Sequence, residues 1–201
     1  MIARNRAWPL LLLLLTLCAC SGNAAIEEPS FTPIQTASPS PSPEISPAPT
    51  PPSAFSLSLG DQVVSLKDRE SKIDLASLLG PPVSEETKDL QGDGFTGSKV
   101  KTVRYPGLEI EMFAPPGETP QYWLMTMTVT SDAYRTPAGV QIGDRLSDLQ
   151  AVYPDIQLAL DGRTDPMNGA YQIADDRQYN YVQFEVADGI LTQIRIFHLI
   201  P

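Results

Sequence analysis

The stretch Tyr134 to Pro154, YRTPAGVQIGDRLSDLQAVYP, carries the signals that decide the fold. Val140 and Ile142 predict a short apolar strand, and Gly143 predicts a turn directly after it. Asp144 is a residue type that favours the N-cap of a helix, and Pro154 marks the end of that helix. We therefore expect a loop, a short strand, a turn and a short helix in this order.

A weaker copy of this stretch lies 76 residues earlier in the chain. Ile142 to Leu149 reads IGDRLSDL and Leu66 to Ile73 reads LKDRESKI, so both follow the pattern apolar, x, Asp, Arg, x, Ser, x, apolar. Asp68 is then expected to cap a helix that carries Ile73, Leu75, Leu78 and Leu79 and ends at Gly80. The globular part is predicted to be two related units in tandem, residues 55–131 and 132–201.

Alternation of apolar and polar residues predicts strands around these helices. Phe55 to Leu66 is predicted to be a hairpin with a turn at Gly60-Asp61, and residues 83–98 and 155–169 are predicted to be loops. In the stretch Tyr122 to Thr130 we expect Trp123, Met125, Met127 and Val129 to share one face. The other strands are expected at Val100 to Tyr105, Leu108 to Phe113, Tyr171 to Ile173, Tyr179 to Val186 and Leu191 to Leu199. The predicted fold class is α+β, with each unit a short helix packed on a three-stranded antiparallel meander.

The first 19 residues have the form of a secretory signal. Arg4 and Arg6 precede an apolar run that is too short for a permanent membrane span. The sequence Leu17-Cys18-Ala19-Cys20 that follows resembles the lipobox of bacterial lipoproteins, whose peptidase cuts before a lipid-modified cysteine. A small residue is needed before the cut, and Ala19 meets this need for Cys20, whereas Leu17 does not for Cys18. We expect Cys20 to be acylated, with palmitate-type chains anchoring the protein in the cell membrane on its extracytoplasmic face.

Residues 20–54 are predicted to be a linker. Nine prolines lie between Pro29 and Pro52, interleaved with Ser, Thr and Ala. Proline removes backbone donors and favours extended polyproline geometry, so this stretch is expected to be a disordered, semi-rigid stalk.

Charge and cysteine content narrow the range of functions. Of the 14 basic residues the leader contains two, which leaves 12 basic against 24 acidic residues. Nucleic acid and anionic lipid repel such a chain. Cys18 and Cys20 are the only cysteines of the sequence, so the predicted units contain neither a disulfide nor a cysteine-based metal site.

The whole chain resembles uncharacterised lipoproteins of Gram-positive bacteria, which combine a lipobox and a Pro/Ser stalk with such units. The segment Ala159 to Ile173, ALDGRTDPMNGAYQI, is the most recognisable part of this resemblance. More remotely, the repeated unit is similar to small outer-membrane-assembly lipoproteins and to the tandem-repeat β-lactamase inhibitor protein. Gly143-Asp144 matches the Gly-Asp that precedes the helix in those families, whereas Lys67-Asp68 departs from it. The resemblance implies a non-catalytic binding protein of the cell envelope and carries over no active site.

The residues themselves offer few groups for catalysis. His198 is the only histidine and is expected to share a strand face with Ile194 and Ile196. A catalytic triad or an ordinary zinc site therefore has no basis in the sequence, and we expect neither an enzyme nor a cofactor.

The long loop from Asp161 to Asp176 is the predicted ligand-binding segment, because long connections in compact domains are often functional. An envelope protein is the expected partner, bound by residues suited to directional contacts. Further aromatic residues, Tyr122, Trp123, Tyr179 and Tyr181, suit either a binding surface or the core. The candidate contact residues in the loop are Asp161, Arg163, Asp165, Asn168 and Tyr171.

Two alternatives to protein binding stay open. Asp161, Asp165 and Asn168 form a D-x-x-x-D-x-x-N pattern that supplies three oxygen ligands for calcium, although it lacks the spacing of an EF-hand. Aspartate turn chemistry explains the same residues. Carboxylates such as the pair Asp175 and Asp176 also leave an acid-dependent hydrolase formally possible.

Overall fold

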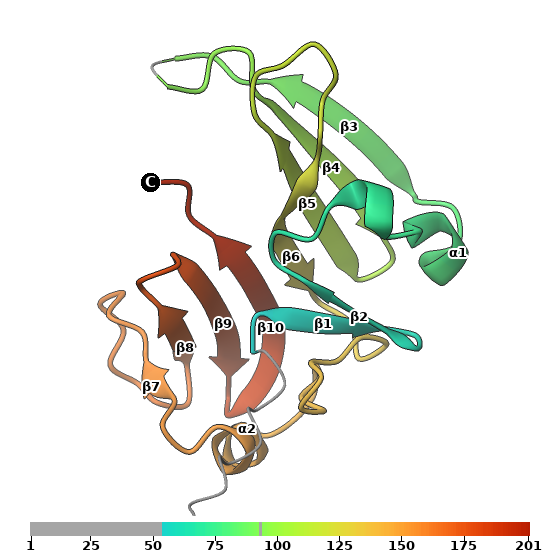
Figure 1. The fold of residues 1–201 in the computed structure, drawn as a ribbon. Helices are drawn as coiled ribbons and strands as arrows, with labels where there is room; N and C mark the ends of the chain where they lie inside the picture. The colour runs from blue at the N-terminus through green and yellow to red at the C-terminus, as the bar shows by residue number, and fades with distance from the viewer. Residues whose placement is uncertain (1–53, 93) are drawn as a thin grey trace, which may run out of the picture. The chain divides into compact units, whose positions relative to one another are not determined.

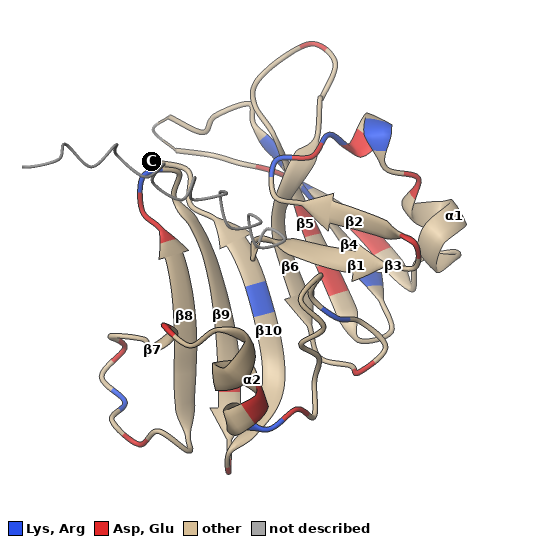
Figure 2. Ribbon diagram, turned by 60° about the horizontal axis from the view of Figure 1, so that its bottom comes forward, with Lys and Arg blue, Asp and Glu red and all other residues tan. Residues whose placement is uncertain are grey.

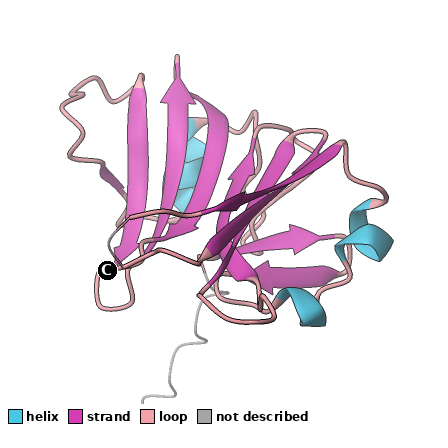
Figure 3. Ribbon diagram, turned by 90° about the horizontal axis from the view of Figure 1, so that it is seen from above, coloured by secondary structure: helices cyan, strands magenta, loops and turns pink. Residues whose placement is uncertain are grey.

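The computed structural model describes residues 54–92 and 94–201, so the predicted signal peptide, Cys20 and almost all of the predicted linker lie outside the described residues. Ala54 and the residues after it belong to one compact unit. Antiparallel strands dominate this unit, and its helices are short (Figures 1 and 3). Its elements are β1 (Ser56–Leu59), β2 (Gln62–Ser65), the 3-10 helix η1 (Glu70–Lys72), α1 (Leu75–Leu79), β3 (Ser84–Asp89), β4 (Lys99–Tyr105), β5 (Leu108–Ala114), β6 (Trp123–Val129), α2 (Leu146–Val152), β7 (Gln157–Leu158), β8 (Gly169–Asp175), β9 (Asn180–Ala187) and β10 (Ile190–His198).

The main sheet has eight strands in the order β3-β4-β5-β6-β10-β9-β8-β7. Each half is an antiparallel meander of strands that follow one another in the chain. The last strands of the two meanders, β6 and β10, pair at the centre, where Thr128 lies opposite Arg195. The prediction of an α+β protein with antiparallel meanders is thus confirmed in outline. The two predicted units share one sheet, and each half contributes four strands rather than three.

One face of this sheet carries the core. Every second residue of the central strands is fully buried there, as Ile110 on β5, Phe184 on β9 and Ile194 on β10 illustrate. Leu57 of the β1–β2 hairpin and Leu149 of α2 belong to the same cluster. The hairpin crosses in front of the junction of β6 and β10 in Figure 1. The hairpin and α2 therefore cover the core face, and most of the stabilising burial lies between them and the sheet.

The turn at Lys67 attaches the hairpin to β6. Lys67 N donates to Leu124 O at 2.8 Å, and Leu124 N donates to Asp68 O at 2.9 Å. The Asp68 carboxylate accepts a hydrogen bond from the backbone N–H of Ser65 at 2.8 Å. Lys67 has a φ of 68°, a left-handed conformation that costs energy in a residue with a side chain.

The turn at Gly143 attaches α2 to β10 through the same set of bonds. Gly143 N donates to Leu191 O at 2.9 Å, and Leu191 N donates to Asp144 O at 2.8 Å. The Asp144 carboxylate accepts from the N–H of Gln141 at 2.8 Å, and φ at Gly143 is 93°. The copied sequence therefore adopts the same backbone arrangement at both places.

The prediction that Asp68 and Asp144 cap helices is wrong. Both carboxylates turn back to an N–H three residues earlier, because the left-handed residue before each aspartate reverses the chain. The cap of α1 is Asp74, whose carboxylate accepts from Ser77 N at 3.0 Å. The N-cap position of α2 is occupied by Arg145.

Several strand predictions need correction. The predicted loop 83–98 contains β3, whose residues are all exposed, so no alternation marks it. The predicted loop 155–169 contains the short strand β7. Near Val140, Gln141 forms only an isolated bridge with Arg135 instead of a strand. The single helix predicted after Asp68 is divided into η1 and α1, and the first-unit hairpin and the remaining strands lie where they were expected.

The predicted face of β6 is also wrong in part. The pairing with β5 shifts between Glu111 and Met112, which is the mark of a β-bulge. Beyond this bulge the alternation changes phase, so Leu124 is buried with Met127 and Val129, whereas Trp123 is only half-buried.

Candidate functional site

The predicted loop from Asp161 to Asp176 is a loop only as far as Asn168, because Gly169–Asp175 forms β8. Arg163, in the loop part, lies between two carboxylates. Its Nε and Nη2 donate to Asp161 Oδ2 at 2.8 and 2.5 Å, and its Nη1 and Nη2 donate to Glu185 at 2.8 and 3.1 Å. The hydrogen bonds from Arg163 lower the pKa of Asp161, and the two acids, Glu185 first, raise the pKa of Arg163. The charge of Arg163 is thus balanced by two carboxylates at the protein surface, and the side chain fastens the loop to β9.

Asp165 and Asn168 hold the loop in shape. Asp165 accepts from Met167 N and from Asn168 Nδ2, both at 2.9 Å, and these bonds, Asn168 first, lower the pKa of Asp165. Asn168 Oδ1 in turn accepts from Asp188 N at 2.9 Å. Both carboxylate oxygens of Asp165 are therefore engaged in turn contacts. Within residues 54–92 and 94–201, His, Cys, Asp and Glu side chains form no group of three that could hold a metal ion.

Tyr171 is buried rather than presented to a partner. Its side chain is 4% exposed, on the core face of β8, and its hydroxyl donates to Pro166 O at 3.0 Å. Burial raises the pKa of this hydroxyl. Of the five predicted contact residues, the structure brings Asp161 with Arg163 and Asp165 with Asn168 into direct contact, and it gives Tyr171 a role in packing.

Asp175 ends β8, and Asp176 follows it in the turn to β9. Asp175 accepts from Gln178 N at 3.2 Å, and Asp176 accepts from the Tyr181 hydroxyl at 3.1 Å. The two neighbouring carboxylates thus have different partners, one in the turn and one on β9.

His198 has structural contacts at the end of β10. Its Nδ1 lies 2.9 Å from Asn180 Oδ1, and its ring meets the edge of the Trp123 ring at a centroid distance of 5.5 Å. Burial, and next the positive charge of Lys67, lower the pKa of His198. A neutral imidazole is therefore favoured at neutral pH.

The sheet face opposite the core, which we name the open face, carries a different set of side chains. On β9 the core residues Val182 and Phe184 are fully buried. The residues that alternate with them, Tyr181, Gln183 and Glu185, are half-buried. Arg195 on β10 lies opposite Gln183 and is exposed. The loop contact of Arg163 reaches Glu185 on this face, so the predicted loop borders the open face.

An aromatic patch, consisting of Tyr181, Arg195 and Phe197, lies on the open face toward the start of β9 and the end of β10. The rings of Tyr181 and Phe197 stack with centroids 5.3 Å apart, and the guanidinium of Arg195 lies 4.7 Å from the centroid of Phe197. Trp123 and Phe113 form a second ring pair, at 5.4 Å, where β5 ends and β6 begins. Aromatic and arginine side chains are the types that dominate binding energy at protein interfaces.

Charge is distributed unevenly over the sheet. Figure 2 shows acidic and basic residues concentrated on β3 to β5, while β8 to β10 are mostly uncharged. On β4 and β5, Arg104 and Glu109 pair at 2.6 Å. The side of the open face with the aromatic patch is therefore the less charged side, as is typical of the centre of an interface.

Sequence reasoning placed Tyr181 among the aromatic candidates but missed Arg195 and Phe197. The alternation of Ile194, Ile196 and His198 contained the signal, because residues between inward-facing positions point to the other face. The arginine and aromatic stack itself depends on strand pairing and has no local signature.

No protein family, no curated protein and no solved structure matches this chain. Among the described residues, no helix is long and apolar enough to cross a membrane.

Proposed function

We propose that this protein is a lipid-anchored protein of the extracytoplasmic membrane face that binds another envelope protein without catalysis. The anchor rests on the lipobox-like sequence Leu17-Cys18-Ala19-Cys20 behind an apolar leader. The binding role rests on the open face described above. The resemblance to envelope lipoproteins, which stands on sequence motifs, agrees with both parts.

The single observation that carries the binding role is the stack of Tyr181, Phe197 and Arg195 on a sheet face that carries no core. Stacking already orders these side chains, so that binding costs little additional conformational entropy. The patch presents both an apolar surface and a cation, which suits the centre of a protein interface. The loop residues Asp161 and Arg163 reach the same open face through Glu185 and extend the proposed contact surface.

The proposal extends to the architecture of the binding surface. We infer that residues 55–131 and 132–201 are related helix-plus-meander units, joined through β6 and β10 into one continuous surface. The matching bonds of Lys67 with Leu124 and of Gly143 with Leu191 support this relation. The symmetric strand order, with each meander ending at the centre of the sheet, supports it as well.

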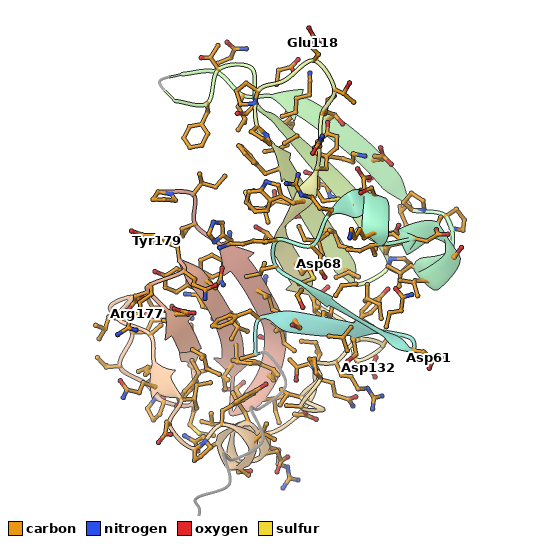
Figure 4. The ribbon with its side chains drawn as sticks, viewed as in Figure 1. Asp61, Asp68, Glu118, Asp132, Arg177 and Tyr179 are labelled. Atoms are coloured by element: carbon orange, nitrogen blue, oxygen red, sulfur yellow. The ribbon has the colours of Figure 1, made fainter. Side chains whose placement is uncertain are left out.

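Photo-crosslinking tests the binding surface directly. A photoreactive residue is placed at Gln183, opposite Arg195, in one soluble protein and at Asp61 in a matched control, since Asp61 projects from the tip of the β1–β2 hairpin (Figure 4). With membranes of the source cell, position 183 should capture a discrete protein and position 61 should not. Arg195→Glu should weaken capture at least tenfold at an unchanged melting temperature.

Two outcomes would overturn the assignment. Equal capture from both positions would show that the open face is not the contact surface. Capture that survives proteolytic digestion of the membranes would replace the protein partner with a glycan or a lipid.

Fractionation tests the anchor. Cys20→Ser should move the protein from the membrane to the soluble fraction, whereas Cys18→Ser should leave it on the membrane. The opposite pattern would assign lipidation to Cys18.

A further inference from the structure

A groove of about 950 Å³ lies beside the β7–β8 edge, separate from the aromatic patch. Tyr153, at the end of α2, Leu158 on β7 and Ile173 on β8 form part of its wall. Val152 and Leu160 line it too, although they are 41% and 106% exposed. This volume is at the upper end of the range for small-ligand sites, and exposed apolar side chains at such a site are costly unless something covers them.

The same groove contains a strand edge that the described strands leave partly unpaired. β7 pairs only with Tyr171 and Gln172 of β8, and Ala159 N donates to Ala170 O at 2.7 Å. Alternate residues of a strand direct their backbone groups to the same edge, so Ala174 faces this edge as Ala170 does. β8 continues to Asp175, beyond the reach of β7. An extended segment can therefore lie in the groove and bond to the backbone of β8.

We propose that residues 46–53 of this chain, SPAPTPPS, dock in the groove. Ala54, the residue that follows them, is itself part of the groove wall, so the preceding residues start from this surface. The segment carries no charge and four prolines, which fits an apolar groove. Proline limits the backbone conformations that must be given up on docking.

Attachment to Ala54 makes this segment the favoured occupant. A peptide joined to its site through a short connection has an effective concentration in the millimolar range. Groove binding too weak for a free peptide is therefore sufficient for the attached one. Docking would fix the point at which the stalk leaves the domain. It would thereby also fix the orientation of the open face relative to the stalk.

A spin label measures docking in the intact soluble chain. Residues 21–201 lack both natural cysteines, so Thr50→Cys provides a single labelling position. A nitroxide at position 50 should broaden the backbone amide signals of Leu158, Leu160 and Ala174. The amides of β3 should keep their intensity and serve as the internal reference.

Matched variants separate docking from chance proximity. Val152→Glu with Leu160→Glu places charge at exposed groove positions and should reduce the broadening at Ala174 at least twofold. Val63→Glu, at an exposed position of the hairpin, should leave it unchanged. Replacing the four prolines of residues 46–53 with glycine should also reduce it.

The proposal fails if the groove charges leave the broadening unchanged or if the broadened amides lie elsewhere. It also fails if the broadening grows with protein concentration, because that dependence would identify a second copy as the occupant.

Discussion

The turn at Lys67 and the turn at Gly143 make the same hydrogen bonds with different residues. At the second turn glycine adopts a φ of 93° without steric cost, whereas at the first a lysine is held at 68°. Lys67 N donates to Leu124 O, and the bonds of Asp68 with Leu124 N and Ser65 N hold the turn around the lysine. The comparison teaches that the tertiary bonds determine this conformation, and that the residue in the turn only changes its energy.

We expect the largest loss of stability from substitutions at Leu124 and Leu191, the strand residues to which the two turns are hydrogen-bonded. Leu124 and Leu191 are both fully buried at the start of the central strands. Leu124→Ala and Leu191→Ala should each lower the free energy of unfolding by about 2–5 kcal/mol, through lost burial and a cavity. Urea denaturation measures both. If only one of the two substitutions lowered the free energy of unfolding by less than about 1 kcal/mol, the two turns would not be equivalent.

The two turn aspartates are expected to contribute less. Asp68→Ala and Asp144→Ala should each cost about 1–2 kcal/mol, because the N–H of Ser65 or Gln141 loses its charged acceptor. Asp61→Ala, on the exposed hairpin tip, should cost less than about 0.5 kcal/mol and is the matched control. Thermal unfolding of the three variants compares them, and unequal losses at Asp68 and Asp144 would show that the turns differ in more than sequence.

Exchanging the residue types at the two left-handed positions, Lys67 and Gly143, tests the backbone strain directly. Gly143→Lys should destabilise the protein by about 1 kcal/mol, since open space surrounds Gly143 and only the backbone opposes the side chain. Lys67→Gly should stabilise it by less than about 1 kcal/mol, because relief of strain exceeds the entropy cost of glycine. Opposite signs in chemical denaturation would confirm the comparison, and equal signs would contradict it.

The smallest expected effect concerns pH, and it arises from the first turn. The pKa of His198 lies below its ordinary 6.5 in the folded protein, because of burial and then the charge of Lys67. Between that lowered value and 6.5 the unfolded chain binds more protons, so stability is lost as pH falls through this window. His198→Gln should remove the loss. Lys67→Met should raise the histidine pKa measured by NMR titration, and an unchanged value would exclude the charge as a cause.

Local patterns predicted much of this fold. The hairpin signal at Gly60-Asp61 and the alternation along β5, β9 and β10 depend on neighbouring residues, and the structure has these strands. β3 was missed because Ser84–Asp89 is exposed on both faces and pairs only with β4, so its sequence lacks apolar alternation. The cap at Asp68 was wrong because the conformation of Lys67 is imposed by Leu124, a residue far away in the chain.

The candidate site was harder to predict from the sequence than the fold was. The residues of the long loop were selected as free contacts, but Arg163 and Asp165 are satisfied by Glu185 and Asn168. Pairing between loop residues and a distant strand leaves no local pattern. The aromatic patch joins residues from two strands, and only the register of β9 and β10 brings Tyr181 beside Phe197.

The two ends of the sheet limit how copies of this protein associate. At one end, β3 presents Glu85, Glu86, Lys88 and Asp89 along an edge on which every residue is exposed. Charged side chains on an edge strand oppose the addition of another strand from a neighbouring molecule. At the other end, β7 is only two residues long, and the edge of β8 beyond it is where residues 46–53 are proposed to dock. With that segment docked, both ends of the sheet would oppose the addition of a strand from a neighbouring copy.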